Sequence, residues 1–301
     1  MKAEVENFLS HLSAERSLSP NTISAYKNDL SQLEEFVAQS STRLGLSTSW
    51  SALDKSMLTT YLVSLKEKEY APATVARKVA AARSFFRFLM SEGMLAKDPT
   101  QDIASPKVGK SLPRPISVSE VEALLHQPVG TSPEARRDRA MLELMYASGM
   151  RVSELVSLDM GDVNLNEGQV RCFGKGAKER IIPVHPTAAQ AVAEYLNEAR
   201  PRLARDSSEK GLFLNRRGAR LTRQGFWLIL KTCAKEAGIR SDITPHTLRH
   251  SIATHLLHSG KMNLRQLQEF LGHANIATTQ VYTHLTSEHL RRVYDQSHPR
   301  A

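Results

Sequence analysis

The sequence predicts a mainly α-helical protein of two domains with one small antiparallel β-sheet. Most segments place apolar residues three and four positions apart, which is the spacing of an amphipathic helix. One region, 168–184, reads as a strand pair, and one stretch, 103–115, combines three prolines with a glycine and has no helical period. With 301 residues, 41% of them hydrophobic and 24% charged, the chain is long enough to build two cores.

The first domain, residues 1–105, is predicted to consist of helices. Ser19 can cap a helix that Pro20 opens, and apolar residues then follow at helical spacing as far as Val37. Further helices are expected from Leu53 to about Lys68 and from Pro72 to about Met90. The last of these is predicted to carry a basic face, which either solvates the helix or follows a phosphate backbone. That face comprises Arg77, Lys78, Arg83 and Arg87.

A linker at 106–116 separates this part from the second domain, residues 117–301. Ser117 and Glu120 form a capping-box sequence that opens the new domain with a helix. Strands at 168–173 and 179–184 flank the glycine-rich turn 174–178, and Leu212–Leu214 is expected to add a third strand. Helices are predicted for the rest, at about 133–148, 187–204, 222–237, 245–259, 263–271, 276–284 and 287–295.

The net charge of +9 belongs to the second domain alone. Residues 1–105 contain 12 basic and 12 acidic side chains, whereas residues 106–301 contain 28 basic and 19 acidic ones. A basic excess confined to one domain indicates a polyanionic partner, of which nucleic acid is the usual example, or else simply a solvated basic surface.

Several classes of protein are excluded or disfavoured by composition. The apolar runs are too short to span a bilayer, and the N-terminus lacks the unbroken apolar stretch of a signal peptide. Cys172 and Cys233 lie far apart, which excludes a cysteine-based zinc module and argues against a disulfide scaffold. We therefore expect a cytoplasmic protein without membrane insertion.

The segment around residues 244–250 is suited to bind a phosphate. Thr244 can cap a helix and Pro245 can open it, so His246 and Arg249 share one face at its N-terminus. The backbone N–H groups and the positive end of the helix dipole point to the same place. A zinc site is not indicated, because HExxH is absent and no carboxylate lies beside His246 and His250.

Other segments contain single polar residues next to helix-breaking glycines. Gly149 is expected to end a helix just before Arg151, and Gly272 to end another just before His273. Lys175 lies between two glycines in the turn, without the GxxxxGK[ST] pattern of a P-loop. Tyr282 falls two turns into the helix that Asn275 is expected to cap. Taken singly, each of these residues is more simply explained as a surface or core residue.

Taken together and in order, these residues resemble the signature of the tyrosine site-specific recombinases of the phage integrase family. The signature comprises Arg151, Lys175, His246-x-x-Arg249, Leu271-Gly-His273 and Tyr282. The surrounding phrases SGMRVSEL, GKGAKER, PHTLRHSIATHLLHSG and LGHANIATTQVYTHL are similar to the Xer subgroup. LTRQGFWLILK and the closing SHPRA look closer to its XerD branch than to its XerC branch. The resemblance covers nearly the whole chain.

The resemblance implies a fold and a reaction. The fold would be a SAM-like core-binding bundle followed by the catalytic domain. Tyr282 would attack a DNA phosphodiester and form a 3′-phosphotyrosine, without ATP, metal or cofactor. Arg151 and Arg249 would bind the non-bridging oxygens, and His273 would add a hydrogen bond. Lys175 would protonate the leaving 5′-oxygen, and His246 would either accept the tyrosine proton or orient the phosphate.

Glu154, one turn after Arg151, would either hold that arginine in place or cap its helix. The helix near 287–296 is expected to dock on a neighbouring protomer, the alternative being that its apolar stripe of Leu290 and Val293 folds back onto its own domain. Arg223 and Gln224 open the helix that would enter the major groove of DNA.

The implied partners are a double-stranded DNA recombination site and three further copies of this chain or of a paralogue in a cyclic tetramer, with an FtsK-type DNA translocase as a further partner. The implied role is the resolution of chromosome and plasmid dimers at cell division. The alternatives are a type IB topoisomerase, an integrase or transposase of a mobile element, and a non-catalytic DNA-binding protein.

Overall fold

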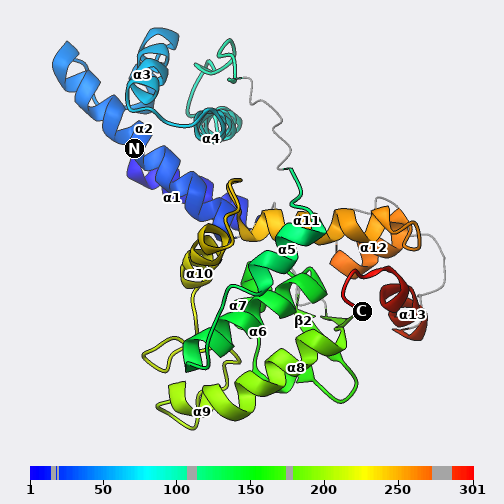
Figure 1. Cartoon of the computed structure of the whole chain (residues 1–301). Helices are drawn as coiled ribbons and strands as arrows, with labels where there is room; N and C mark the ends of the chain where they lie inside the picture. Colours follow the sequence, from blue (N-terminus) through cyan, green and yellow to red (C-terminus); the bar gives the residue numbers. More distant parts are fainter. Residues whose placement is uncertain (15–17, 19, 107–113, 174–178, 273–286) are drawn as a thin grey trace. The chain divides into compact units, whose positions relative to one another are not determined.

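A computed structural model of the chain describes residues 1–14, 18, 20–106, 114–173, 179–272 and 287–301. The chain divides into two compact units, Met1–Ser111 and Leu112–Ala301, which Figure 1 shows in colours that follow the sequence. This division falls within the stretch 106–116 in which the sequence places a linker. The helical fold class with a small antiparallel sheet is confirmed in the described residues.

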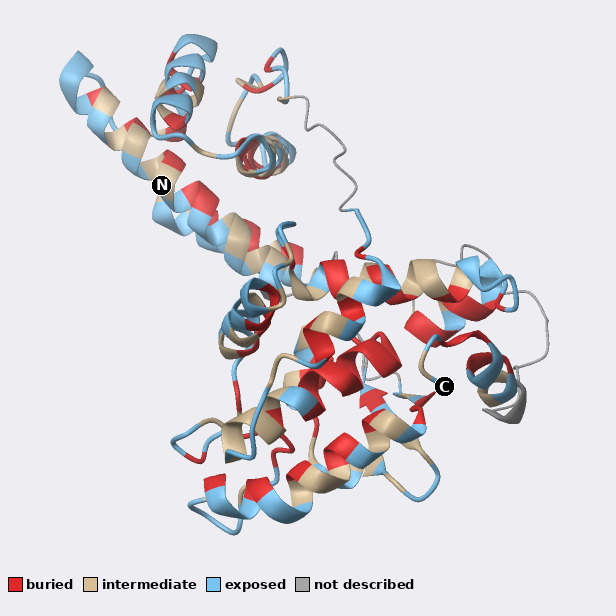
Figure 2. Cartoon of the chain, in the orientation of Figure 1, coloured by how far each residue is buried: buried red, intermediate tan, exposed pale blue. Residues whose placement is uncertain are grey.

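The first unit is a helical bundle. Its elements are α1 (Lys2–Ala14), α2 (Pro20–Leu44), the 3₁₀ helix η1 (Trp50–Ala52), α3 (Lys55–Glu67) and α4 (Pro72–Ser91). The sequence analysis gave no bounds for helix α1, although Val5, Phe8 and Leu12 follow the helical spacing and are buried. Edge-to-face ring contacts join Phe8, Trp50 and Phe85 in the centre of the bundle, where helix faces are buried (Figure 2).

One residue of the predicted basic face of α4 does not lie on that face. Lys78 is 3% exposed, and its Nζ donates to Asp29 Oδ1 at 2.9 Å and to Gln32 Oε1 at 2.8 Å. Arg77 also pairs with Asp29, whereas Arg83 is half-buried and donates to the carbonyl oxygen of Ile103. The interpretation of Lys78 as part of an outward basic surface is therefore wrong.

The second unit contains most of the helices and the sheet. Its helices are α5 (Val118–Leu125), α6 (Pro133–Ser148), α7 (Val152–Ser157), η2 (Met160–Asp162), α8 (Pro186–Glu194), the π-helix η3 (Tyr195–Ala199), α9 (Arg200–Leu203), α10 (Arg223–Glu236), α11 (Pro245–His258), α12 (Leu264–Leu271) and α13 (Ser287–Ser297). The capping box of Ser117 and Glu120 forms as predicted at the start of α5. The helix expected at 276–284 lies outside the described residues.

The sheet is antiparallel, in the order β1 (Val163–Asn164), β2 (Gln169–Phe173) and β3 (Glu179–Pro183). Val170 pairs with Ile182, which confirms the predicted pairing of the last two strands. The third strand was predicted wrongly. Leu212–Leu214 is buried but forms no strand, and only isolated bridges occur at Gly211 and Leu214. Its apolar residues serve the core rather than a sheet edge.

Helix α13 packs on its own unit, next to α11 and β3. Tyr294 is fully buried, and its hydroxyl donates to the carbonyl oxygen of Ala147 at 3.1 Å. Val293 is buried and Leu290 packs against the same core. In this single chain the apolar stripe therefore folds back onto its own domain, which was the alternative interpretation of the sequence. An exchange with a neighbour would require α13 to leave this place.

Within the described ranges, every helix is too short or too polar to cross a bilayer.

Candidate active site

Two glycines shape the place where Arg151 lies. Gly149 ends α6 in the left-handed conformation, with φ +56°, and Gly272 ends α12 in the same way, with φ +66°. A Cβ atom on Gly149 would lie 2.9 Å from Leu271 Cδ2, so a glycine is needed for both its conformation and its packing. The end of α6 therefore packs directly against the end of α12.

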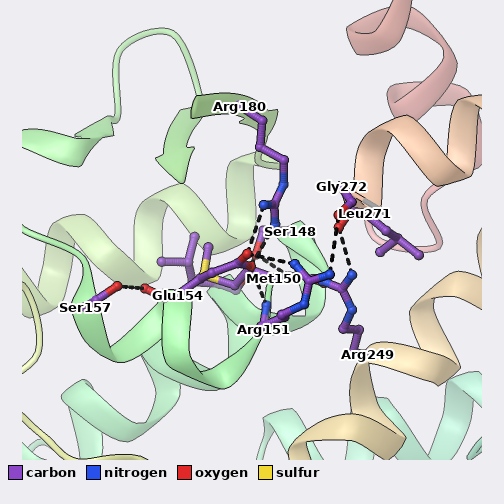
Figure 3. Close-up of polar contacts among 11 residues, drawn as sticks. Ser148, Met150, Arg151, Glu154, Ser157, Arg180, Arg249, Leu271 and Gly272 are labelled. Atoms are coloured by element: carbon purple, nitrogen blue, oxygen red, sulfur yellow. Dashed lines mark hydrogen bonds and ion pairs between the residues drawn. The ribbon is translucent and has the colours of Figure 1, made fainter. Parts of the chain in front are cut away.

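Arg151 follows the first of these glycines and caps α7. Its backbone N–H donates to Glu154 Oε2 at 2.7 Å, and its Nη1 donates to Glu154 Oε1 at 3.0 Å. Its Nη2 donates to the carbonyl oxygen of Gly272 at 3.3 Å (Figure 3). The side chain is 44% exposed, so the guanidinium is fixed in direction yet open to a ligand. Glu154 thus fulfils both of the roles that the sequence left open, holding the arginine and capping its helix.

Arg249 lies deeper than Arg151. It is 7% exposed, and its two terminal nitrogens donate to the carbonyl oxygens of Gly149 and Leu271, the latter at 2.7 Å. Burial, and then repulsion by Arg151, lower the pKa of Arg249 to about 10, so it stays protonated at neutral pH. Arg151 and Arg249 therefore both donate to the end of α12, at Gly272 and Leu271 (Figure 3), and Arg249 also donates to Gly149 at the end of α6.

Arg180, on β3, was missed by the sequence analysis. Its Nη1 and Nη2 donate to the two oxygens of Glu154 at 2.9 and 2.7 Å, as Figure 3 shows. Burial would raise the pKa of Glu154, but the hydrogen bonds from Arg180 and from the Arg151 backbone, with both positive charges, lower it. The available signal was Glu154 itself, because a carboxylate on the buried side of a short helix needs more than one partner.

The cluster carries a net positive charge. Three guanidinium groups, those of Arg151, Arg180 and Arg249, surround the single carboxylate of Glu154, which leaves a net charge of +2. A phosphodiester carries one negative charge and gains another in the transition state of its transfer. The arrangement is thus suited to bind a phosphate whose charge increases as it reacts.

The other predicted site residues fall in different places. His246 is exposed in the first turn of α11, which Thr244 caps by accepting a hydrogen bond from the Thr247 N–H at 3.1 Å, as predicted. Arg223 and Gln224 are exposed in the first turn of α10. Lys175, His273 and Tyr282 lie outside the described residues, although His273 follows Gly272 directly in the sequence.

Among the described residues, no group of three or more His, Cys, Asp or Glu side chains is arranged to hold a metal ion. Cys172 and Cys233 are both buried free thiols.

Comparisons with known proteins identify the family of the chain. Residues 115–289 match the phage integrase family, and residues 5–93 match the phage integrase N-terminal SAM-like domain. The tyrosine recombinase XerC of Herpetosiphon aurantiacus is 50% identical over 99% of this chain and 95% of its own length. The tyrosine recombinase XerD of Listeria monocytogenes is 47% identical over 99% of both chains. These identities do not separate the two branches, so the closer similarity to XerD stays a prediction.

A solved structure of XerH site-specific recombinase bound to its difH substrate has the same fold, with a TM-score of 0.69 and 23% identity over 91% of this chain and 76% of XerH. The chain belongs to the phage integrase family of tyrosine site-specific recombinases, which are DNA strand-transfer enzymes.

Proposed function

We propose that this chain cuts and rejoins double-stranded DNA at a specific site through a covalent bond to Tyr282. The observation that supports this proposal most strongly is the pair of guanidinium groups of Arg151 and Arg249. They are fixed at adjacent helix ends, with a net positive charge around them. XerH, which shares the fold, is recorded bound to its DNA substrate, and this supports DNA as the ligand.

The reaction requires a balanced exchange at phosphorus. The Tyr282 oxygen forms a bond to the phosphorus and the bond to the 5′-oxygen breaks, which conserves the bond energy for religation. The tyrosine proton goes to a base, for which His246 is our candidate, and Lys175 gives a proton to the 5′-oxygen. Arg151, Arg249 and His273 stabilise the added negative charge, and each such donor contributes about 2.7–4 kcal/mol to lowering the barrier.

DNA would be held by basic side chains of both units. Arg87 and Arg77 of α4 and Arg223 of α10 are exposed or half-buried, as a phosphate contact requires, and Arg83 reaches solvent in part. Gln224, also exposed, is suited to read a base edge in the major groove. Lys78 is left out of this set because it is buried in an ion pair.

Strand exchange would take place in a cyclic tetramer of this chain, alone or with a paralogue, through a Holliday junction. Its similarity to Xer recombinases is consistent with a role in the resolution of chromosome and plasmid dimers at cell division, which we include in the proposal. That role would place it in the cytoplasm, where free thiols such as Cys172 and Cys233 persist, and would bring it under an FtsK-type translocase.

Product topology tests this proposal. The purified chain is first used to map the sequence it binds, and two direct copies of that sequence are placed on a supercoiled plasmid. We expect two smaller circles from this plasmid and no relaxation of a plasmid without the sites. Tyr282→Phe should give neither product. Relaxation of any duplex by single molecules would instead assign a topoisomerase.

A further inference from the structure

Glu154 has its full set of hydrogen bonds, and Arg180 supplies half of them. Oε1 accepts from Arg151 Nη1 and Arg180 Nη1, while Oε2 accepts from the Arg151 backbone N–H and Arg180 Nη2. The two arginines therefore approach the carboxylate differently. Arg180 binds both oxygens, whereas the side chain of Arg151 reaches only one of them.

This division leaves Arg151 with unused donors. A guanidinium has five N–H donors, and the described residues accept from two of its terminal nitrogens, through Glu154 and Gly272. A carboxylate prefers to bind an arginine through two parallel hydrogen bonds. If Arg180 did not occupy both oxygens, Glu154 would be free to bind Arg151 in that way and to draw its donors away from a phosphate.

Arg180 also lies against the second acceptor of Arg151. A Cβ atom on Gly272 would lie 3.0 Å from Arg180 Nη1, so the guanidinium fills the space that a side chain there would need. Glu154 and Gly272, the two groups that hold the Arg151 side chain, therefore both contact Arg180.

Arg180 and Glu154 are both largely buried, so the loss of either partner would be costly. The side chains of Arg180 and Glu154 are 15% and 5% exposed. Arg180 Nε is buried and finds no acceptor among the described residues, which is a cost that a mere surface ion pair would not carry. Removing Arg180 would leave a buried carboxylate with one charged partner in place of two.

We propose that Arg180 is a positioning residue, which holds Glu154 so that Arg151 keeps its free donors for the scissile phosphate. The inference rests on the proposed function, because it assigns the phosphate to Arg151. Arg180 acts through Glu154 and does not itself touch the substrate.

The test uses the full chain, a suicide DNA substrate and single-turnover cleavage at saturating protein. Arg180→Gln should bind the site within about twofold of wild type but cleave it about 100-fold more slowly, the cost of a misplaced catalytic group. Arg180→Lys, which keeps the charge but offers a single nitrogen, should fall between them. The matched control is Arg171→Gln, from the neighbouring strand, where Arg171 pairs with Asp162 at 3.1 Å. It should cleave like wild type.

Two further readouts separate positioning from other roles. In a Glu154→Gln background, Arg180→Gln should cause no further loss, whereas a direct phosphate contact would keep its full effect there. Arg180→Gln removes the largest of the interactions that lower the pKa of Glu154 against the effect of burial, so this pKa should rise and the loss of cleavage should grow as the pH falls from 7 to 5. If thermal melting shows that Arg180→Gln is not folded, both measurements are made on Arg180→Lys instead.

The inference is overturned if folded Arg180 variants cleave like Arg171→Gln, if their effect persists in full without Glu154, or if the loss is the same at pH 5 and pH 7. A failure of the proposed function looks different, because wild type itself would then form no covalent adduct with the substrate.

Discussion

At the scale of single residues, the site depends on arginines whose charges are only partly neutralised. Arg249 donates to two carbonyl oxygens and Arg151 to one carbonyl and one carboxylate. A carbonyl fixes the direction of a guanidinium without cancelling its charge. Both groups are therefore held in place before a phosphate arrives, which is the condition for electrostatic stabilisation of a transition state.

Lys175 should act on the leaving group. Lys175→Ala is expected to slow cleavage of a normal phosphodiester by about 100-fold or more, because the 5′-oxygen must leave with a proton. A substrate with sulfur at the 5′-bridging position needs no proton and should restore most of the rate. Lys178→Ala, three positions later in the sequence, is the control and should cleave both substrates normally. Equal damage to both substrates in Lys175→Ala would give this lysine another role.

Arg151 and Arg249 were predicted from the ordered set of residues that resembles the recombinase signature, and each lies beside a recognisable local signal, a helix-ending glycine or a capped helix start. Both signals are confirmed at Gly149 and Thr244. Arg180 carries no such signal. Its role depends on β3 bringing it to α7, 26 positions away in sequence, and single-residue patterns do not contain pairings of that range.

At the scale of elements, the sequence analysis assigned Lys78 of α4 to the wrong face of its helix. Lys78 lies three positions after Val75 and four before Ala82, both buried, so its spacing placed it on the apolar face. Its charge suggested the opposite face. Asp29 and Gln32 of α2 resolve this conflict by accepting its hydrogen bonds inside the bundle.

Lys78 and Arg87 should therefore respond differently to truncation. Lys78→Ala should lower the unfolding free energy of the first unit by about 3 kcal/mol, because it breaks a buried ion pair. Arg87→Ala, at an exposed position, should leave stability within about 0.5 kcal/mol. Denaturant unfolding measures both.

The salt dependence of DNA binding tests whether Arg87 contacts a DNA phosphate. Arg87→Ala should reduce the slope of log affinity against log salt by about 0.9, the value of one lost phosphate contact. An unchanged slope would mean that the α4 face is only solvated.

The C-terminal segment is anchored by neutral histidines. The His298 ring lies among Tyr146, Tyr294 and His185, at ring-centre distances of 4.7–5.2 Å, and its Nδ1 accepts from the Arg300 N–H. Burial, and then the charge of His185, lower the pKa of His298 to about 3. The folded state thus prefers the uncharged ring.

This preference predicts a loss of stability in acid. A histidine whose pKa is lowered on folding stabilises the protein fully above its unfolded pKa of about 6.5, and the contribution declines as the pH falls toward the folded value. Between pH 7 and pH 5, His298 should cost on the order of 2 kcal/mol. His298→Gln should show a smaller decrease over that range in urea unfolding of the second unit. A decrease equal to that of wild type would show that His298 is not neutral and buried.

At the scale of the whole molecule, the chain has two separate cores, one in each unit. The proline-rich stretch at 103–115 and the change in net charge after it predicted a chain of two domains, because both features can be read directly from the composition of the sequence. The strand of Leu212–Leu214 failed for the converse reason. A short apolar run is equally compatible with a strand and with a buried loop. The choice depends on which segments pair in the folded chain, and here β1 is the strand that pairs with β2.

The orientation of α13 was likewise beyond the sequence. Leu290 and Val293 form an apolar stripe that fits either a neighbouring protomer or its own unit. In the single chain, the hydrogen bond from Tyr294 to Ala147 and the ion pair of Arg300 with Glu143 favour its own unit. A tetramer that exchanges this helix would have to replace those contacts with equivalent ones.

Tyr282 is proposed to join covalently to DNA at a site built around Arg151 and Arg249. A suicide substrate, nicked so that the short cleaved piece diffuses away, traps this adduct for analysis on a denaturing gel. Wild type should form a protein–DNA adduct whose peptide map places the DNA on Tyr282. Tyr282→Phe should bind the same DNA with near-normal affinity and form no adduct, because only the hydroxyl is lost. An adduct that survives in Tyr282→Phe, or that maps to another residue, would show that Tyr282 is not the nucleophile.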